Sequence, residues 1–247
     1  MRGGYEQTVT LHINESLNFT FSNFASILSP AYFSSNKNTG SLRKEVENLN
    51  KKEYSSSLKK TPYKYLIAKK IAKLMLNNMD RAEVYKECYN NNYIEIDSPE
   101  RRREIINIIY ERLLSLDSFL LRQFYEGDLV TSKFILVYAI SKSDRLFFEF
   151  LFEVYREALI GEKSYISLDD FDHFFAVKKE NDPIVAKWGT YTTSQLAKGY
   201  RTILVDSGLG KREKRNIKVT RVMIHPVVEE HLKMLGDTEY LKALLGE

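Results

Sequence analysis

Apolar residues recur at helical spacing through the middle of the chain, and this pattern constrains the fold more strongly than any other feature of the sequence. Between Thr61 and Gly161 they return every three or four residues, as Ile109 and Leu113 do. No part of this stretch alternates between apolar and polar residues, as a half-buried strand does. We therefore predict that the stretch is helical throughout and that residues 61–165 form a helical bundle.

Capping residues mark where the helices of this bundle begin. Thr61-Pro62 and Ser98-Pro99 each place a hydroxyl residue before a proline, which is favoured at the first helical position. Ser143-Asp144 is expected to cap a later helix that ends before Gly161. The apolar stripe of the first helix is expected to comprise Leu66, Ile67, Ile71 and Leu74.

The first sixty residues carry weaker signals. Many Ser, Asn and Thr residues are mixed with scattered apolar ones, and Leu42–Leu58 has the spacing of a charged helix. We predict that residues 1–60 form an N-terminal arm or a peripheral layer.

Three short helices are expected in the C-terminal third of the chain. Ser167 caps the first of them in a weak capping box, and Asp182-Pro183 opens the second. Thr192 or Thr193 caps the third, which closes at Gly208 because glycine readily adopts the left-handed conformation that ends a helix.

An alternating segment follows these helices. Ile217–Ile224 has the pattern of a strand, after a basic turn at Gly210–Asn216. Three helices followed by a hairpin is the order of a winged helix, and Trp188 is expected to fill the core of that unit. The predicted fold is therefore mainly α, with an N-terminal helical bundle followed by a C-terminal winged-helix-like unit (residues 166–247) that carries a small β-hairpin.

The net charge of +4 hides two strongly basic segments. Lys37–Lys73 contains eleven Lys and Arg against three Glu, and Lys187–Arg221 contains nine against Asp206 and Glu213. The rest of the chain is consequently acidic. Such a distribution favours a surface that binds a polyanion, although solvated helix faces produce similar runs of charge.

The third short helix is the candidate recognition helix, because helix-turn-helix domains place this helix in the major groove of DNA. Leu196, Tyr200 and Ile203 share one face, and the polar residues opposite them are positioned to meet phosphates and base edges. A basic cluster at the hairpin tip extends this surface. The predicted DNA-contacting residues are Ser194, Gln195, Lys198, Arg201, Thr202, Lys211, Arg212, Lys214, Arg215 and Lys218.

Patterns for catalysis or metal binding are weak. The acidic cluster Asp169–His173 lies in the first turns of a predicted helix, where the helix dipole favours carboxylates without a metal. Gly208–Lys211 lacks the first glycine of a phosphate-binding loop, and Arg212 stands where that loop needs Ser or Thr. The single cysteine, Cys88, excludes a disulfide within the chain and is expected to be a core or half-buried thiol. We predict no enzyme activity, no cofactor and no metal.

Hydropathy predicts a soluble, cytoplasmic chain with no membrane partner. The longest uninterrupted apolar run, Phe134–Ile140, has seven residues, far fewer than the ~20 that span a bilayer. Met1–Thr10 lacks the apolar stretch of a secretory signal. No pattern indicates the oligomeric state.

Several segments, in order along the chain, resemble one protein family. The first are Glu111-Arg112-Leu113, Tyr125–Asp128, Tyr138-Ala139, Arg145-Leu146-Phe147 and Phe171–Phe175. The later ones are Trp188, Thr192-Thr193, Leu196, Tyr200, Ile203-Leu204 and Ser207-Gly208-Leu209. From about Ala68 to its end the chain resembles the small A component of BREX bacteriophage-defence systems. It departs from that pattern after Leu209, where Gly210 and a basic cluster replace a Gly-Leu-Leu-like stop.

This resemblance implies a non-enzymatic accessory protein of a multi-gene anti-phage locus, similar in shape to helical transcription-antitermination factors and associated with DNA binding. It carries over no catalytic residues, and its inner-membrane label is contradicted by the lack of a spanning segment. The predicted function is binding of double-stranded DNA in a bacterial defence system, with other defence proteins as further partners. Two alternatives stay open: an adaptor that docks acidic partner subunits, and a transcriptional regulator of its own locus.

Overall fold

The structure, a computed structural model, describes residues 52–246, which all belong to one unit of the chain, Asn38–Glu247. Most of the predicted arm (1–60) and of the Leu42–Leu58 helix lies outside the described residues. The first described elements are the 3₁₀ turn η1 (Ser57–Lys59), α4 (Tyr65–Leu76), α5 (Arg81–Asn90), α6 (Pro99–Leu114), α7 (Ser118–Glu126), α8 (Leu129–Ser143), α9 (Arg145–Phe150), the π-helical segment η2 (Leu151–Tyr155) and α10 (Arg156–Ile160).

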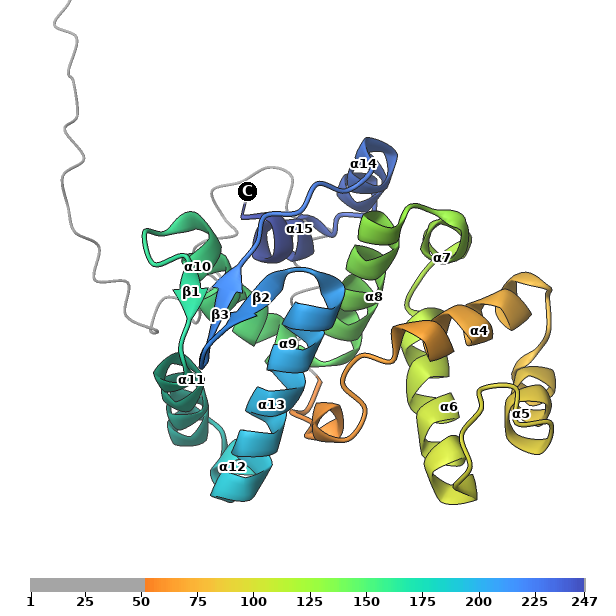
Figure 1. Ribbon diagram of the computed structural model, residues 1–247, viewed down its shortest axis with the longest axis horizontal. Helices are drawn as coiled ribbons and strands as arrows, with labels where there is room; N and C mark the ends of the chain where they lie inside the picture. Colours follow the sequence, from red (N-terminus) through yellow and green to blue (C-terminus); the bar gives the residue numbers. More distant parts are fainter. Residues whose placement is uncertain (1–51, 247) are drawn as a thin grey trace, which may run out of the picture. The chain divides into compact units, whose positions relative to one another are not determined.

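These elements confirm the predicted helical stretch, since residues 52–161 contain no strand (Figure 1). The caps at Ser98 and Asp144 are also confirmed: the Ser98 hydroxyl accepts from the amide of Arg101 at 3.2 Å, and Asp144 accepts from the amide of Phe147 at 3.0 Å. Both caps satisfy amides that the first turn of a helix leaves without a partner.

The predicted start of the first helix at Thr61-Pro62 is wrong. Helix α4 begins at Tyr65, after Lys64 in the left-handed conformation (φ 58°). The cause is a tertiary contact, because Arg112 donates to the carbonyl oxygens of Thr61 at 2.6 Å and of Pro62 at 3.3 Å. These carbonyls therefore point away from a helical turn.

The apolar stripe predicted for this helix is partly wrong. Ile71 and Leu74 are buried as expected, but the side chain of Leu66 is 74% exposed. Leu66 thus lies on the face of α4 that is turned away from the core of the bundle.

The C-terminal part combines helices with a small sheet. Its order is β1 (Tyr165–Ile166), α11 (Leu168–Asn181), α12 (Pro183–Ala186), α13 (Thr190–Ser207), β2 (Gly210–Glu213), β3 (Asn216–Val219), α14 (Pro226–Met234) and α15 (Thr238–Leu245). The three strands are antiparallel in the order β1-β3-β2, with Ile166 opposite Ile217 and Gly210 opposite Val219. Three helices followed by a hairpin are compatible with the predicted winged-helix-like unit. Strand β1 spans the expected boundary between residues 165 and 166.

The predicted strand Ile217–Ile224 is too long. Strand β3 ends at Val219, whose partner is Gly210. One more hydrogen bond follows, from the Thr220 amide to the carbonyl oxygen of Leu209 at 2.9 Å, and before Leu209 the chain turns into α13 at Gly208, which adopts φ 87°. Without a partner strand the following residues are irregular, and Met223 is 92% exposed. The basic turn expected before this strand is in fact strand β2 with the hairpin tip.

The predicted cap of the third helix is also wrong, because α13 begins earlier, at Thr190. Both Thr192 and Thr193 lie inside its first turn, where their amides donate to the carbonyl oxygen of Gly189 at 2.9 and 3.3 Å. The Thr193 hydroxyl donates to the carbonyl oxygen of Thr190 rather than capping an amide.

An aromatic cluster joins the bundle to the C-terminal part. The ring of Phe150 in α9 lies 5.0 Å from those of Phe171 in α11 and Tyr200 in α13, and 5.4 Å from that of Phe174. All four residues are buried. Trp188, which we expected in this core, is only half-buried. The core between these elements is therefore formed by the Phe150 cluster and not by the tryptophan.

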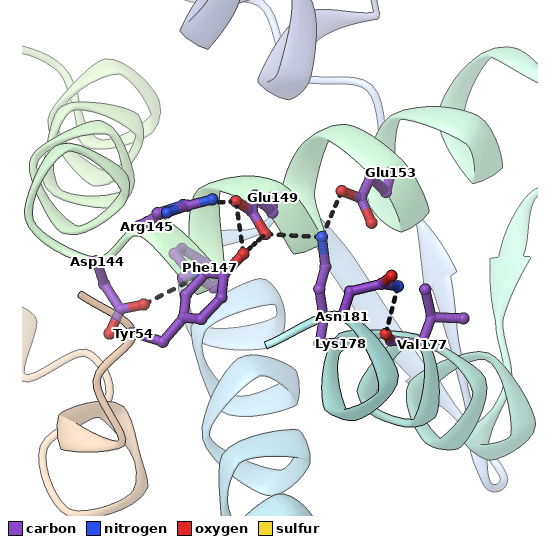
Figure 2. A network of polar contacts seen from close by, with 9 residues as sticks. All are labelled: Tyr54, Asp144, Arg145, Phe147, Glu149, Glu153, Val177, Lys178 and Asn181. Atoms are coloured by element: carbon purple, nitrogen blue, oxygen red, sulfur yellow. Dashed lines mark hydrogen bonds and ion pairs between the residues drawn. The ribbon is translucent and has the colours of Figure 1, made fainter. Parts of the chain in front are cut away.

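A buried polar network ties the same elements together (Figure 2). Glu149 in α9 accepts hydrogen bonds from the Tyr54 hydroxyl at 2.8 Å and from Arg145 Nε at 2.8 Å. Lys178 of α11 lies 2.7 Å from Glu149 and 2.6 Å from Glu153. Because each buried charge has an oppositely charged neighbour, the network fixes α11 and the Tyr54 segment against the bundle.

Candidate nucleic-acid interface

Helix α13 has one buried face and one polar face. Leu196, Tyr200 and Ile203 are fully buried, as their spacing predicts. On the polar face Ser194 and Lys198 are exposed. The other residues of α13 that we predicted to contact DNA are half-buried: Gln195, Arg201 and Thr202.

The β2–β3 hairpin lies beside α13 (Figure 1) and carries five of the predicted cations, Lys211, Arg212, Lys214, Arg215 and Lys218. Lys211 lies directly opposite Lys218 in the antiparallel register. Like charges at opposite positions of a sheet destabilise it. At the tip, Lys214 adopts φ 54°, a conformation that favours glycine or asparagine. Lysine thus occurs both where like charges face each other and where the backbone favours glycine. Locally unfavourable residues of this kind are typical of a functional surface.

Arg201 connects the helix to the hairpin. Its Nη2 atom donates to the carbonyl oxygen of Arg215 at 3.0 Å, while its Nε atom is buried without a hydrogen-bond partner among the described residues. Burial, followed by the nearby charge of Arg212, lowers the pKa of Arg201 below its ordinary value. The two guanidinium groups are thus close enough to repel each other, and a bound anion between them would relieve this repulsion.

The cations of this surface have no acidic partners within the described part of the chain, residues 52–246. Elsewhere in that part some lysines are paired, as Lys163 is with Asp170 at 2.7 Å and Lys142 with Asp237 at 2.9 Å. No such ion pair involves Lys198, Arg201, Lys211, Arg212, Lys214, Arg215 or Lys218. Their positive charge is therefore available to an external anion.

The structure arranges the predicted residues unequally. The hydroxyl of Thr202 donates to the carbonyl oxygen of Lys198 at 3.0 Å, so it is engaged within the helix. The sequence did not single out two tyrosines of this region: Tyr191, 75% exposed in the first turn of α13, and Tyr165, opposite Lys218 in β1. The position of Tyr165 depends on strand pairing, which the residues around it do not reveal.

Other chemistry has little support in residues 52–246. The acidic cluster Asp169–His173 includes the expected capping box, in which Asp170 accepts from the Ser167 amide at 2.6 Å. Within this range no group of three or more His, Cys, Asp or Glu side chains is arranged to hold a metal ion. Cys88 is fully buried, as predicted. None of the helices described has the length and apolar character needed to cross a membrane.

Comparisons with known proteins agree on one family. The family model described as BrxA matches residues 52–236. A relative from Bacillus cereus (strain H3081.97), "BREX protein BrxA", is 34% identical over 194 residues, which cover 78% of this chain and 97% of the relative.

A solved structure shares the fold. The crystal structure of an uncharacterized protein from Magnetospirillum magneticum superposes with a TM-score of 0.69 and 19% sequence identity, covering 79% of this chain and 100% of that protein. At this identity the likeness concerns the fold alone. Because the family model and the Bacillus relative each cover about three quarters of the chain or more, the resemblance in the sequence is confirmed, and the chain belongs to the BrxA family of BREX phage-defence systems.

Proposed function

We propose that this chain is a non-enzymatic accessory protein of its BREX system that binds double-stranded DNA. The polar face of α13 enters the major groove, and the β2–β3 hairpin contacts the adjacent backbone. The observation that carries this proposal is the group of seven cations without ion pairs to the described residues, on one helix and the hairpin beside it. Lys and Arg that neutralise phosphates supply most of the affinity in such complexes.

Specificity for sequence is expected to be modest. Ser194 and Gln195 are the polar side chains near the start of α13 that are suited to reading base edges. Arg201 is half-buried and engaged with the hairpin, and this limits its reach. Most contacts would then go to phosphates, which position the protein but carry no sequence information.

The proposal is tested by electrophoretic mobility assays on double-stranded DNA, single-stranded DNA and RNA probes of equal length. The expected result is preferential binding of the duplex DNA, with affinity that falls steeply as salt rises. Equal binding of duplexes with unrelated sequences would favour the accessory function over a regulator of its own locus. Absence of duplex binding at low salt would refute the proposal.

A protein–protein adaptor is the second candidate. The segments around Leu129 and Met223 expose apolar side chains, and a hydrogen bond of 2.9 Å from the His225 amide to the Thr131 hydroxyl holds these segments together. Exposed apolar residues that cluster are typical of protein-binding surfaces. Co-purification of other defence proteins with the chain, lost when Met223 is replaced by Lys, would support this function.

A further inference from the structure

A groove of about 620 Å³ adjoins the polar face of α13 at its C-terminal end. It is lined by Val205 and Asp206 of α13, by Lys133 of α8, and by Tyr63–Ile67, the segment that leads into α4. Lys198 and Val205 are seven residues apart and therefore share a face of the helix. The groove thus continues the surface that we propose to contact DNA.

Two tyrosines join the segment before α4 and the first turn of α4 to α8 by hydrogen bonds. Tyr63 donates to the carbonyl oxygen of Lys133 at 3.1 Å, and the Tyr65 hydroxyl lies 2.9 Å from that of Ser132. Tyr63 is buried, and these contacts fix the start of α4 against α8. Lys64 and Lys133 are consequently held at the same groove by a rigid frame.

Neither lysine is neutralised by an acidic side chain in the part of the chain that the structure describes. Lys64 is exposed and Lys133 half-buried, and neither forms an ion pair with any of residues 52–246. The one carboxylate lining the groove belongs to Asp206, which is exposed. Two cations against one anion give the groove a net positive charge.

The groove and the hairpin flank α13 on different sides. Around the helix axis Arg201, which contacts the hairpin, is separated by about 140° from Asp206 and by about 40° from Val205, the two residues of α13 that line the groove. Contacts agree with this arrangement, since α13 packs against β2 and β3 and also against α8 and η1 (Figure 1). A helix lying in a major groove about 12 Å wide has one phosphate backbone on each side.

We propose that Lys64 and Lys133 form a second phosphate-contact site, through which the helical bundle binds the DNA strand on the side of α13 opposite the hairpin. This proposal rests on the proposed function. The ligand is the phosphodiester backbone of the duplex, and the site reads no base. Asp206 opposes the approach of phosphate and limits the affinity of this site.

The test measures duplex affinity by fluorescence anisotropy over a series of salt concentrations. Lys64→Asn removes the charge while retaining a residue that tolerates the left-handed conformation, and Lys133→Gln leaves the backbone contact with Tyr63 in place. Each change should weaken binding about fivefold at 0.15 M salt and flatten the slope by about 0.9. Asp206→Asn should instead strengthen binding.

Lys73→Gln is the matched control, because Lys73 is exposed at the other end of α4. Thermal unfolding of each variant verifies that it is folded. For comparison, the hairpin variants Lys211→Gln and Arg212→Gln are measured in the same way. The inference is overturned if the Lys64 and Lys133 variants bind as the Lys73 variant does while these hairpin variants lose affinity. Failure of the wild-type protein to bind duplex DNA would overturn the proposed function and this site together. Loss of affinity in the Lys64 and Lys133 variants, with hairpin variants unaffected, would support this site and refute the hairpin.

Discussion

The guanidinium of Arg201 donates a hydrogen bond to the carbonyl oxygen of Arg215 at 3.0 Å, and so fixes the hairpin tip to the middle of α13. A lysine cannot reproduce the planar guanidinium geometry, although it keeps the charge. Arg201→Lys should therefore weaken duplex binding about tenfold because the hairpin is no longer preorganised. The slope of affinity against salt should stay unchanged.

Hydrogen exchange separates this positioning effect from loss of a phosphate contact. The amides of the β2–β3 hairpin should exchange faster in the Arg201→Lys protein than in the wild type, without DNA present. An unchanged exchange rate together with a flatter salt slope would show that Arg201 acts as a free cation instead.

At Lys214 we expect one substitution to raise stability and to lower DNA affinity. Its left-handed conformation is unfavourable for a residue with a Cβ atom, so Lys214→Gly should raise the free energy of unfolding by roughly 0.5–1 kcal/mol. The same change should lower duplex affinity and flatten the salt slope by about one. Urea unfolding and anisotropy measure the two effects, and a variant that is destabilised would contradict this account of the turn.

Asp144 should make stability depend on pH. Burial raises the pKa of this carboxyl group to about 6, whereas in the unfolded chain it is about 3.9. Because the folded state holds the proton more tightly, stability from this group is present below pH 4 and is lost as pH rises through 6. Asp144→Asn keeps the capping oxygen without the charge. Urea unfolding at pH 4 to 7 should show the wild type losing about 2 kcal/mol relative to this variant, and parallel curves would refute the assignment.

Lys178 should be essential for the stability of the buried network. Its removal leaves Glu149 and Glu153 buried without their shared cation. Lys178→Met, which keeps the apolar stem, should cost about 3–5 kcal/mol in urea unfolding. The control Lys187→Met changes an exposed lysine and should have little effect. A similar small effect at both positions would mean that the network does not depend on this ion pair.

Close packing of η1 on α13 depends on one glycine. A Cβ atom on Gly199 would lie 2.6 Å from the carbonyl oxygen of Leu58, which is backbone and cannot rotate away. Gly199→Ala should therefore destabilise the protein by about 1–3 kcal/mol. At Gly189 a Cβ atom would meet nothing within 4 Å, so Gly189→Ala is the control. Equal unfolding midpoints for the two variants would be inconsistent with this packing.

Local signals in the sequence predict what local contacts determine. Ser98, Asp144 and Ser167 cap helices as expected because each interacts with an amide only two or three residues away. Thr61 does not cap a helix as expected, because its carbonyl oxygen accepts a hydrogen bond from Arg112. Arg112 is distant in the sequence, so no local signal reveals this contact. Strand β3 is shorter than the alternating segment Ile217–Ile224, because the length of a strand depends on how far its partner strand extends.

The candidate interface shows the same limit. The buried and polar faces of α13 follow from helical periodicity alone, as Leu196 and Tyr200 confirm. Lys64 and Lys133 are separated from Val205 by many residues, and only tertiary packing brings them to one groove. No periodicity within a single segment could have joined them.

The salt dependence of duplex binding tests the central proposal most directly. The variant Lys198→Gln/Lys211→Gln/Arg212→Gln removes three cations of the interface, and Lys73→Gln/Lys86→Gln/Arg122→Gln removes three exposed cations elsewhere. Both variants have the same net charge. We predict that the first flattens the slope of log affinity against log salt by about 2.7 while the second leaves it unchanged. Identical slopes for the two variants would contradict DNA binding through α13 and its hairpin.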